Sequence, residues 1–329
     1  MNPQDPASFN HQLADVNGKT YHYIDAGKGD IVFLLHGFPD LWFGWRYQIP
    51  FLVSQGYRVI VPDMLGYGRT SAPYAPPSDL AAVKPYSFLS VCTDLAALLT
   101  HVTGSSTSSA VFIGHDWGSA TAWRMCLHFP QRVKAVAGLC VPFYPPTDEF
   151  INLERRAEKW AQFRYQVYCS RSEADDELGA MIPQFLNALY RGTDEDNNKF
   201  MYLDSFKKLP HDMPRTQKLA LSEKEFEYYL SEFQRTGLHG PLNWYRTRLV
   251  NFQDEKRRGS PKKIHHPALF IPALNDEVIP PILWKPITQT VPGVTVCPLP
   301  TGHWIMMEMP DKVNSILGEW LASLQKSKL

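Results

Sequence analysis

The sequence predicts an α/β fold, in which a mostly parallel sheet flanked by helices carries an inserted helical block. Short apolar runs rich in Val, Ile, Leu and Phe alternate with longer amphipathic stretches, as in β-α units around a parallel sheet. The alternation stops between about residues 145 and 245, where the chain becomes helical, aromatic and charged. The 329 residues are about twice the length of a typical single domain, which leaves room for a large core and an insertion.

The expected strands and helices follow in chain order. An antiparallel hairpin comes first, over residues 11–26, with Asn17-Gly18 as its turn. Buried strands are then expected at residues 31–35, 58–61, 110–113, 133–141, 268–271 and 294–297. The clearest helices between and after them are expected at residues 86–101, 119–129 and 312–324.

The helical block predicts a cap. A block of about a hundred residues is hard to place inside a sheet, so residues 145–245 are expected to form a lid domain over one edge. Residues 1–144 and 246–329 then form the core. Ligands of such sheets bind outside the carboxyl ends of the strands, so we expect the cap to roof the active site.

The composition argues against several classes of protein. Lys plus Arg is 33 and Asp plus Glu is 33, so no basic surplus is available for a nucleic acid partner. With 44% hydrophobic and 13% aromatic residues, the chain is typical of a globular enzyme with apolar pockets. The five cysteines lack the spacing of a metal site and predict buried thiols in a reducing compartment, with no metal.

The two ends of the chain bear on its location. The N-terminus has neither the basic nor the apolar region of a secretory signal, and no segment is long and apolar enough to span a bilayer. The chain finishes with Ser327-Lys328-Leu329, the tripeptide that an import receptor reads as a peroxisomal address when it is terminal. The alternative is an ordinary helix end rich in Lys and Ser. We therefore expect a protein of the cytoplasm, the peroxisome or both, and not a secreted one.

A candidate nucleophile follows the strand expected at residues 110–113. There Gly114-His115-Asp116-Trp117-Gly118 leads into a helix, as in a nucleophile elbow with Asp where the common motif has Ser. A sharp strand-to-helix turn needs residues without a Cβ on both sides. The five-residue pattern alone is a weak signal, but its place between a buried strand and a helix strengthens it. We therefore expect Asp116 to be the nucleophile.

An acid and a histidine follow in the order that such a triad requires. Asp276 comes after the strand at residues 268–271, and His303 lies in the loop after the last strand. Of the 11 histidines, only His303 has this context. Glu277 beside Asp276 stays open as the acid.

Other polar residues near the motifs are expected to have structural roles. His36 and His115 precede the acid in the chain, and Asp63 at the end of an early strand is expected to cap a loop. The oxyanion hole should use the backbone N–H of Trp117, after the nucleophile, and that of Phe38, after the strand at residues 31–35.

The aspartate at the elbow determines the reaction class. A carboxylate is already ionised at neutral pH and can displace a leaving group at saturated carbon, which forms an alkyl ester of Asp116. Water activated by His303, with Asp276 orienting the imidazole, can then hydrolyse this ester. The substrate is therefore expected to be an epoxide or an alkyl halide. Epoxide opening needs a proton donor such as a tyrosine, but the 15 tyrosines cannot be told apart by spacing.

The motifs resemble those of the soluble epoxide hydrolases of the α/β-hydrolase superfamily, over nearly the whole chain. The resemblance rests on His36-Gly37-Phe38-Pro39, on the elbow, on Asn275-Asp276 and on Gly302-His303-Trp304. Two cap segments, Phe163-Arg164-Tyr165-Gln166 and Pro241-Leu242-Asn243-Trp244-Tyr245-Arg246, are similar to those that supply the family's paired acid tyrosines.

The resemblance implies an α/β-hydrolase fold with an eight-stranded sheet and an enzyme that hydrolyses epoxides to vicinal diols without a cofactor. It implies that Tyr165 and Tyr245 grip and protonate the epoxide oxygen, and that the Phe38-Pro39 peptide is cis. The loop at residues 74–85 is longer than is usual in the family, and its purpose is open.

Two other functions compete with this one. A haloalkane or haloacid dehalogenase shares the Asp elbow and the His base, although Phe38 lacks the side-chain N–H often found there in haloalkane dehalogenases. A binding module on the same fold predicts a broken triad, whereas all three residues are present. Phe163 and Trp304 favour a small apolar epoxide, with lipid epoxides as a hypothesis, although each could equally be core. The oligomeric state is open.

Overall fold

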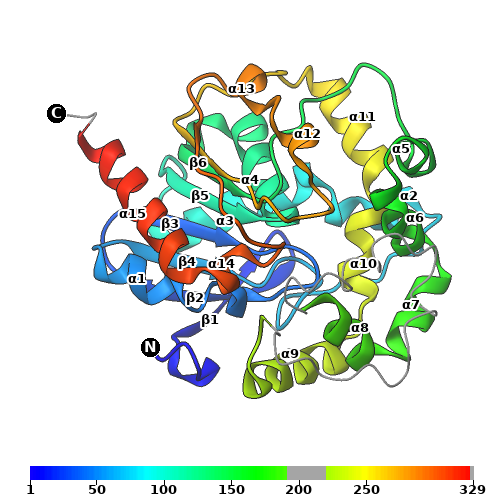
Figure 1. The fold of residues 1–329 in the computed structure, drawn as a ribbon, viewed down its shortest axis with the longest axis horizontal. Helices are drawn as coiled ribbons and strands as arrows, with labels where there is room; N and C mark the ends of the chain where they lie inside the picture. The colour runs from blue at the N-terminus through cyan, green and yellow to red at the C-terminus, as the bar shows by residue number, and fades with distance from the viewer. Residues whose placement is uncertain (191–219, 327–329) are drawn as a thin grey trace. The chain divides into compact units, whose positions relative to one another are not determined.

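The chain forms two compact units, each drawn from separate stretches of the sequence (Figure 1). The computed structural model describes residues 1–190 and 220–326. The first unit comprises Met1–Met64, Cys92–Pro145 and Pro261–Leu329, and the second comprises Leu65–Val91 and Pro146–Ser260. The expected address Ser327-Lys328-Leu329 lies outside the described residues.

The first unit is built on an eight-stranded sheet in the order β1-β2-β4-β3-β5-β6-β7-β8. The pairs β1–β2 and β2–β4 are antiparallel, and the other neighbouring pairs are parallel. This confirms the predicted α/β-hydrolase fold. The strands are β1 His11–Val16, β2 Lys19–Gly27, β3 Ile31–Leu35, β4 Arg58–Pro62, β5 Ala110–His115, β6 Val133–Leu139, β7 Ala268–Ile271 and β8 Thr295–Val296.

Asn17 and Gly18 make the predicted turn between β1 and β2. Both have positive φ, 51° and 75°, as a two-residue hairpin turn requires. The strands β5 and β7 are buried along their whole length, as expected of parallel strands covered on both faces.

Two predicted strands are shorter in the structure than in the prediction. The strand expected to reach Val141 ends at Leu139, because Cys140 has a φ of 63° and leaves the extended conformation. The last strand, expected over residues 294–297, has only two residues. Pro298 follows closely and has no N–H to continue the ladder.

Helices surround this sheet. Within the first unit, α4 lies against β5 and β6, while α1 lies against α15 and β4. Short 3-10 helices are η1 Pro6–Ser8, η2 Trp42–Trp45 and η4 Pro130–Arg132. The α-helices are α1 Gln48–Ser54, α4 Trp117–His128, α12 Pro281–Trp284, α13 Ile287–Thr290, α14 Ile305–Glu308 and α15 Pro310–Lys326, and α3 Phe88–Thr103 runs from the second unit into the first.

In the described part of the second unit, helices are joined by turns and irregular segments. Its α10 packs against α6 and α7, and its α8 packs against α9. Its helices are α2 Leu80–Val83, η3 Lys84–Tyr86, α5 Leu153–Lys159, η5 Ala161–Phe163, α6 Arg164–Ser170, α7 Glu173–Gly179, α8 Ile182–Leu189, α9 Glu223–Thr236, α10 His239–Arg246 and α11 Arg248–Arg258.

The second unit is wider than the expected cap of residues 145–245. It includes α11, because Asn251 accepts a hydrogen bond from the backbone N–H of Phe88, 2.8 Å away within the same unit. It also includes the early segment Leu65–Val91. There Trp244 Nε1 donates to the carbonyl of Leu65 at 2.9 Å, a contact that sequence order does not reveal. The long loop at residues 74–85 therefore belongs to the helical unit.

The five cysteines are free thiols. Four are buried as predicted, whereas Cys297 beside the edge strand β8 is only partly buried. Across residues 1–190 and 220–326, no single helix combines the length and apolar composition of a bilayer span; the bent pair Leu80–Tyr86 and Phe88–Thr103 does so only when taken together.

Candidate active site

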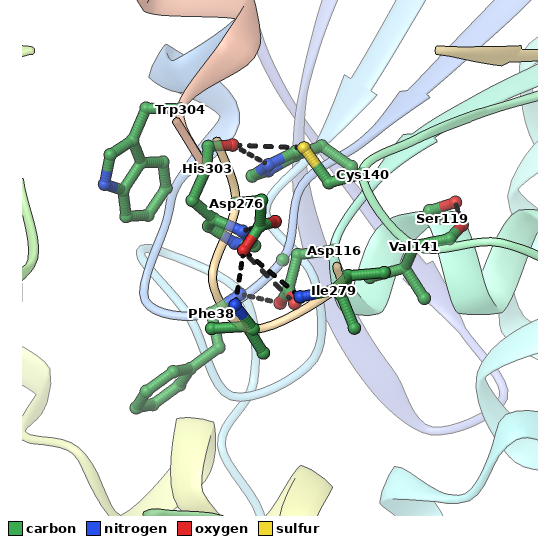
Figure 2. Close-up of polar contacts among 12 residues, drawn as sticks. Phe38, Asp116, Ser119, Cys140, Val141, Asp276, Ile279, His303 and Trp304 are labelled. Atoms are coloured by element: carbon green, nitrogen blue, oxygen red, sulfur yellow. Dashed lines mark hydrogen bonds and ion pairs between the residues drawn. The ribbon is translucent and has the colours of Figure 1, made fainter. Parts of the chain in front are cut away.

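Three predicted residues of the first unit meet where its parallel strands end. Asp116 follows β5, Asp276 follows β7, and His303 follows β8 (Figure 2). The carboxyl ends of parallel strands lie at one edge of a sheet, which brings residues distant in sequence together. This edge is the candidate active site.

Asp116 stands on a strained turn between β5 and α4. Its φ of 53° and ψ of −120° lie in a region that non-glycine residues rarely adopt, and such strain is typical of functional positions. A Cβ on Gly114 would lie 2.1 Å from the carbonyl oxygen of Gly118, and a Cβ on Gly118 would lie 2.0 Å from that of Leu35. The two glycines therefore permit the turn, as the motif predicts.

His303 and Asp276 form a hydrogen-bonded pair. The imidazole Nδ1 lies 2.8 Å from Oδ2 of Asp276, whose Oδ1 accepts the backbone N–H of Val278 at 2.9 Å. Asp276 is buried, whereas Glu277 is exposed. Of the two acids left open by the sequence, the structure brings Asp276 to the histidine.

The other ring nitrogen of His303 faces the carboxyl group of Asp116, the predicted nucleophile. Nε2 lies 3.8 Å from Oδ2 of Asp116. Burial of the imidazole lowers its pKa, but the carboxylates of Asp276, Asp116 and Glu308 outweigh this and raise the pKa of His303 to about 9. Burial also raises the pKa of Asp116 above its ordinary value, although His303 opposes this shift. In the free protein the site therefore pairs an imidazolium with the carboxylates around it.

The predicted oxyanion donors bind the carboxyl group of Asp116. The backbone N–H of Phe38 donates to Oδ1 of Asp116 at 2.8 Å, and the N–H of Trp117 also bonds this carboxyl group. A Cβ on Gly37 would lie 2.4 Å from both Cβ and Oδ1 of Asp116, so only glycine fits there. The Phe38-Pro39 peptide is cis, as the family resemblance implies.

The remaining predicted residues fall in both units. In the second unit, Tyr165 on α6 and Tyr245 on α10 are buried and lie together, with ring centroids 5.8 Å apart at 78°. Phe163, just before α6, is buried under the guanidinium of Arg156 at 3.8 Å. In the first unit, Trp304 is buried with its ring edge-on to that of His303, centroids 5.3 Å apart.

The competing polar residues have structural partners. His36 Nε2 accepts the backbone N–H of Met64 at 2.9 Å, and burial lowers the pKa of His36 to about 4, which keeps it neutral. Asp63 pairs with His22 at 2.7 Å and accepts the N–H of Trp42 at 3.1 Å, where η2 begins. The predicted structural roles of His36 and Asp63 agree with these contacts.

Two residues beside His303, Cys140 and Glu308, were missed as parts of the site, whereas His115 contacts the His303 backbone in keeping with its expected structural role. The carbonyl oxygen of His303 lies 2.8 Å from Nε2 of His115 and 3.2 Å from Sγ of Cys140. Glu308 accepts the backbone N–H groups of Gly302 and Trp304. The only signal in the sequence is that Glu308 follows His303 by five positions.

His115, Cys140 and His303 also place one nitrogen or sulfur each within 4.8 Å of one another, a spacing open to a metal ion. Contacts already engage these side chains: His115 and Cys140 contact the His303 carbonyl, and His303 Nδ1 contacts Asp276. We therefore describe the three residues as a hydrogen-bonding cluster.

Comparisons with known proteins agree with the fold described above. A family model described as the alpha/beta hydrolase fold matches residues 30–310. The chain is similar to epoxide hydrolase srdG of Neurospora crassa, with 32% identity covering 98% of this chain and 97% of that protein. It is 34% identical to bifunctional epoxide hydrolase 2 of Sus scrofa over 99% of its own length, but spans only 57% of that relative. The crystal structure of epoxide hydrolase A from Mycobacterium thermoresistibile superposes with a TM-score of 0.79 at 31% identity, covering 95% of this chain and 98% of that one.

Proposed function

The chain belongs to the alpha/beta hydrolase fold family and groups with its epoxide hydrolases, and from this premise we propose that it converts epoxides to vicinal diols through a covalent ester on Asp116. One observation carries the proposal. An aspartate occupies the elbow, with Oδ1 held by the Phe38 N–H at 2.8 Å and Oδ2 facing His303 at 3.8 Å. A serine hydrolase would need a hydroxyl at this place.

In the first step, Oδ2 of Asp116 attacks a ring carbon of the epoxide and the carbon–oxygen bond of the ring breaks. The electron pair of that bond stays on the epoxide oxygen, which needs a proton. We assign the donation of this proton to the hydroxyl groups of Tyr165 and Tyr245. Their ring centroids lie 5.8 Å apart, so both hydroxyls belong to one pair of neighbouring side chains. Gln166 Nε2 donates to the Tyr165 hydroxyl at 3.1 Å, which helps to orient that hydroxyl.

In the second step, His303 takes a proton from water as the water oxygen attacks the ester carbonyl carbon. Negative charge then develops on Oδ1, to which the Phe38 N–H already donates, and the N–H of Trp117 bonds the same carboxyl group. Collapse of the tetrahedral intermediate breaks the bond between the ester carbon and the alkyl oxygen, and that oxygen takes the proton of the added hydroxyl to give the diol. Asp116 is again a carboxylate, which now carries one oxygen from water, and the tyrosine that gave its proton to the epoxide oxygen regains one from solvent. Asp276 stabilises the imidazolium that forms.

Formation of the ester also prepares the base. Asp116 is one of the carboxylates that raise the pKa of His303 in the free protein. Ester formation removes its charge, so the pKa of His303 falls at the moment when an unprotonated imidazole is required.

The second unit is proposed to act as the cap of this site, with its predicted segment at residues 145–245 as the lid. Phe163 and Trp304, both buried, are proposed to contact an apolar epoxide. We also propose that the chain works in the cytoplasm or, through Ser327-Lys328-Leu329, in the peroxisome on lipid-derived epoxides. Microscopy of the chain with a free C-terminus tests this: uniform exclusion from peroxisomes would contradict the address.

The function is tested by product analysis with purified protein. An apolar epoxide such as styrene oxide and a dihaloalkane such as 1,2-dibromoethane are supplied in parallel. Diol formation without halide release supports the proposal. Halide release without diol formation would assign the same elbow to a dehalogenase.

A further inference from the structure

Glu308 holds the backbone on both sides of the catalytic histidine. It ends α14, five residues after His303. Its Oε2 accepts the backbone N–H of Gly302 at 2.8 Å, and its Oε1 accepts that of Trp304 at 3.1 Å. One half-buried carboxylate therefore binds the backbone N–H groups of the residues immediately before and after His303.

The carbonyl of His303 is held from a different direction. Nε2 of His115, at the end of β5, lies 2.8 Å from this oxygen. Sγ of Cys140, just after β6, lies 3.2 Å from it (Figure 2). Burial lowers the pKa of His115 well below its ordinary value and raises that of Cys140, so both groups keep the proton state of a neutral donor. The backbone around His303 is thus held by three side chains, those of His115, Cys140 and Glu308.

We propose that Glu308 is a positioning residue for ester hydrolysis: by gripping the backbone of Gly302 and Trp304, it keeps the imidazole of His303 between Asp276 and Asp116. The side chain itself needs this support. It must bond Asp276 through Nδ1 while it directs Nε2 at the water that attacks the ester. A loop free to move by about an ångström would lose much of this alignment. The inference rests on the proposed function, since it assigns a role within that reaction.

Glu308 also contributes charge. The groups that face His303 are Asp276, Asp116, Glu308, His115 and Cys140. The Glu308 carboxylate is one of those that raise the pKa of the imidazole. Burial raises the pKa of Glu308 itself, although the N–H groups of Gly302 and Trp304 and the charge of His303 oppose this shift. Removal of the carboxylate therefore lowers the pKa of His303.

These two effects act on one chemical step. Attack by Asp116 on the epoxide needs no base, so ester formation does not depend on where His303 points. Hydrolysis of the ester does depend on it. A purely structural role for Glu308 predicts instead a loss of stability with both steps affected alike.

The experiment uses the full chain with the substitutions Glu308→Ala and Glu308→Gln, and Glu319→Gln on α15 as the control for charge removal at an exposed position. Rapid quenching followed by mass spectrometry measures ester formation and ester hydrolysis separately, with styrene oxide as the substrate. For Glu308→Ala we expect hydrolysis slowed by about 10- to 100-fold, as for other residues that orient a functional ligand, and ester formation unchanged within about twofold. For Glu308→Gln, which keeps the shape and one acceptor oxygen, we expect a smaller loss.

The pH profile supplies the second readout. Hydrolysis rises with pH as His303 loses its proton, so a lower pKa in both Glu308 variants moves this rise to lower pH, while Glu319→Gln leaves it in place. Equal slowing of both steps, or an unmoved profile in the isosteric Glu308→Gln, would overturn the inference while wild-type diol formation still stands. If the wild type forms neither ester nor diol, the proposed function itself falls and the inference falls with it.

Discussion

The backbone N–H of Phe38 donates a hydrogen bond to Oδ1 of Asp116 at 2.8 Å, so one oxygen of the proposed nucleophile already occupies the proposed oxyanion position in the free protein. The two carboxylate oxygens consequently have different roles. Oδ1 is held by the Phe38 N–H, whereas Oδ2 faces His303 and is the oxygen that attacks in the proposed mechanism. The proposed mechanism therefore needs no movement of the elbow between ester formation and ester hydrolysis.

Replacement of Asp116 by Ala should abolish turnover. Without the carboxylate no ester forms, and we expect kcat to fall by at least about 10⁴-fold, as for other covalent nucleophiles. Diol formation measured by chromatography tests this, with far-ultraviolet circular dichroism as the check on folding. Diol formation at a substantial fraction of the wild-type rate in the folded variant would contradict the assignment.

Replacement of Tyr165 and Tyr245 by Phe should slow ring opening. Each change removes a proton donor and keeps the ring that packs on its partner. General acid catalysis contributes about 10²- to 10⁴-fold, so the double variant should lose ester formation by this order. Tyr168→Phe, on the same helix α6 but bonded to Glu177 at 2.9 Å, is the matched control. If the control slows ester formation as much as the double variant does, the tyrosines have no special role.

Substitution of Gly37 by Ala should impair the oxyanion site. The new Cβ would lie 2.4 Å from Oδ1 of Asp116, so the backbone that carries the Phe38 N–H must shift. Loss of one such donor typically costs on the order of 10²-fold, and we expect this loss in ester hydrolysis measured in single turnovers. Gly179→Ala, where an added Cβ meets no atom within 4 Å, should leave the rate unchanged. Equal activity of the two variants would argue against the oxyanion assignment.

The raised pKa of His303 should make the stability of the free protein depend on pH. In the free protein the imidazole is held protonated up to a pH of about 9 by the surrounding carboxylates. A group with a raised pKa in the folded state favours folding most below its unfolded pKa, and that stability disappears as the pH rises through about 9. His303→Gln should remove this part of the decline in the free energy of unfolding.

The rate of ester hydrolysis should also depend on pH through His303, whose pKa should fall when the ester forms. This step needs the unprotonated imidazole, so its rate should rise with pH around a midpoint below the pKa that nuclear magnetic resonance measures for His303 in the free protein. A kinetic midpoint equal to or above that pKa would contradict the proposed link between the charge of Asp116 and the base.

The sequence was sufficient for the features that depend on local chemistry. The alternating runs predicted the sheet, and the glycines around Asp116 predicted the elbow, because a residue without a Cβ is required where backbones come within about 2 Å of an added carbon. The position of His303 after the last strand likewise placed it beside Asp276. The tyrosine pair came from the family resemblance, since spacing alone does not distinguish Tyr165 from other buried tyrosines.

The features that were missed depend on contacts between distant segments. Nothing in the sequence around Cys140 predicts that its thiol meets the carbonyl of His303, which is 163 positions away. The early segment Leu65–Val91 joined the helical unit for the same reason, through the contact of Leu65 with Trp244. The hydrogen bonds of Glu308 join residues that are close in sequence, but they depend on how the loop after β8 folds back on α14.

The covalent ester is tested most directly by one turnover in ¹⁸O-labelled water. With the protein in excess over the epoxide, the ester route predicts that the first diol is unlabelled, because its new oxygen comes from Asp116, and that the peptide containing Asp116 gains one heavy oxygen. A first diol that carries ¹⁸O, with an unlabelled Asp116 peptide, would show that water attacks the epoxide directly and would contradict the account.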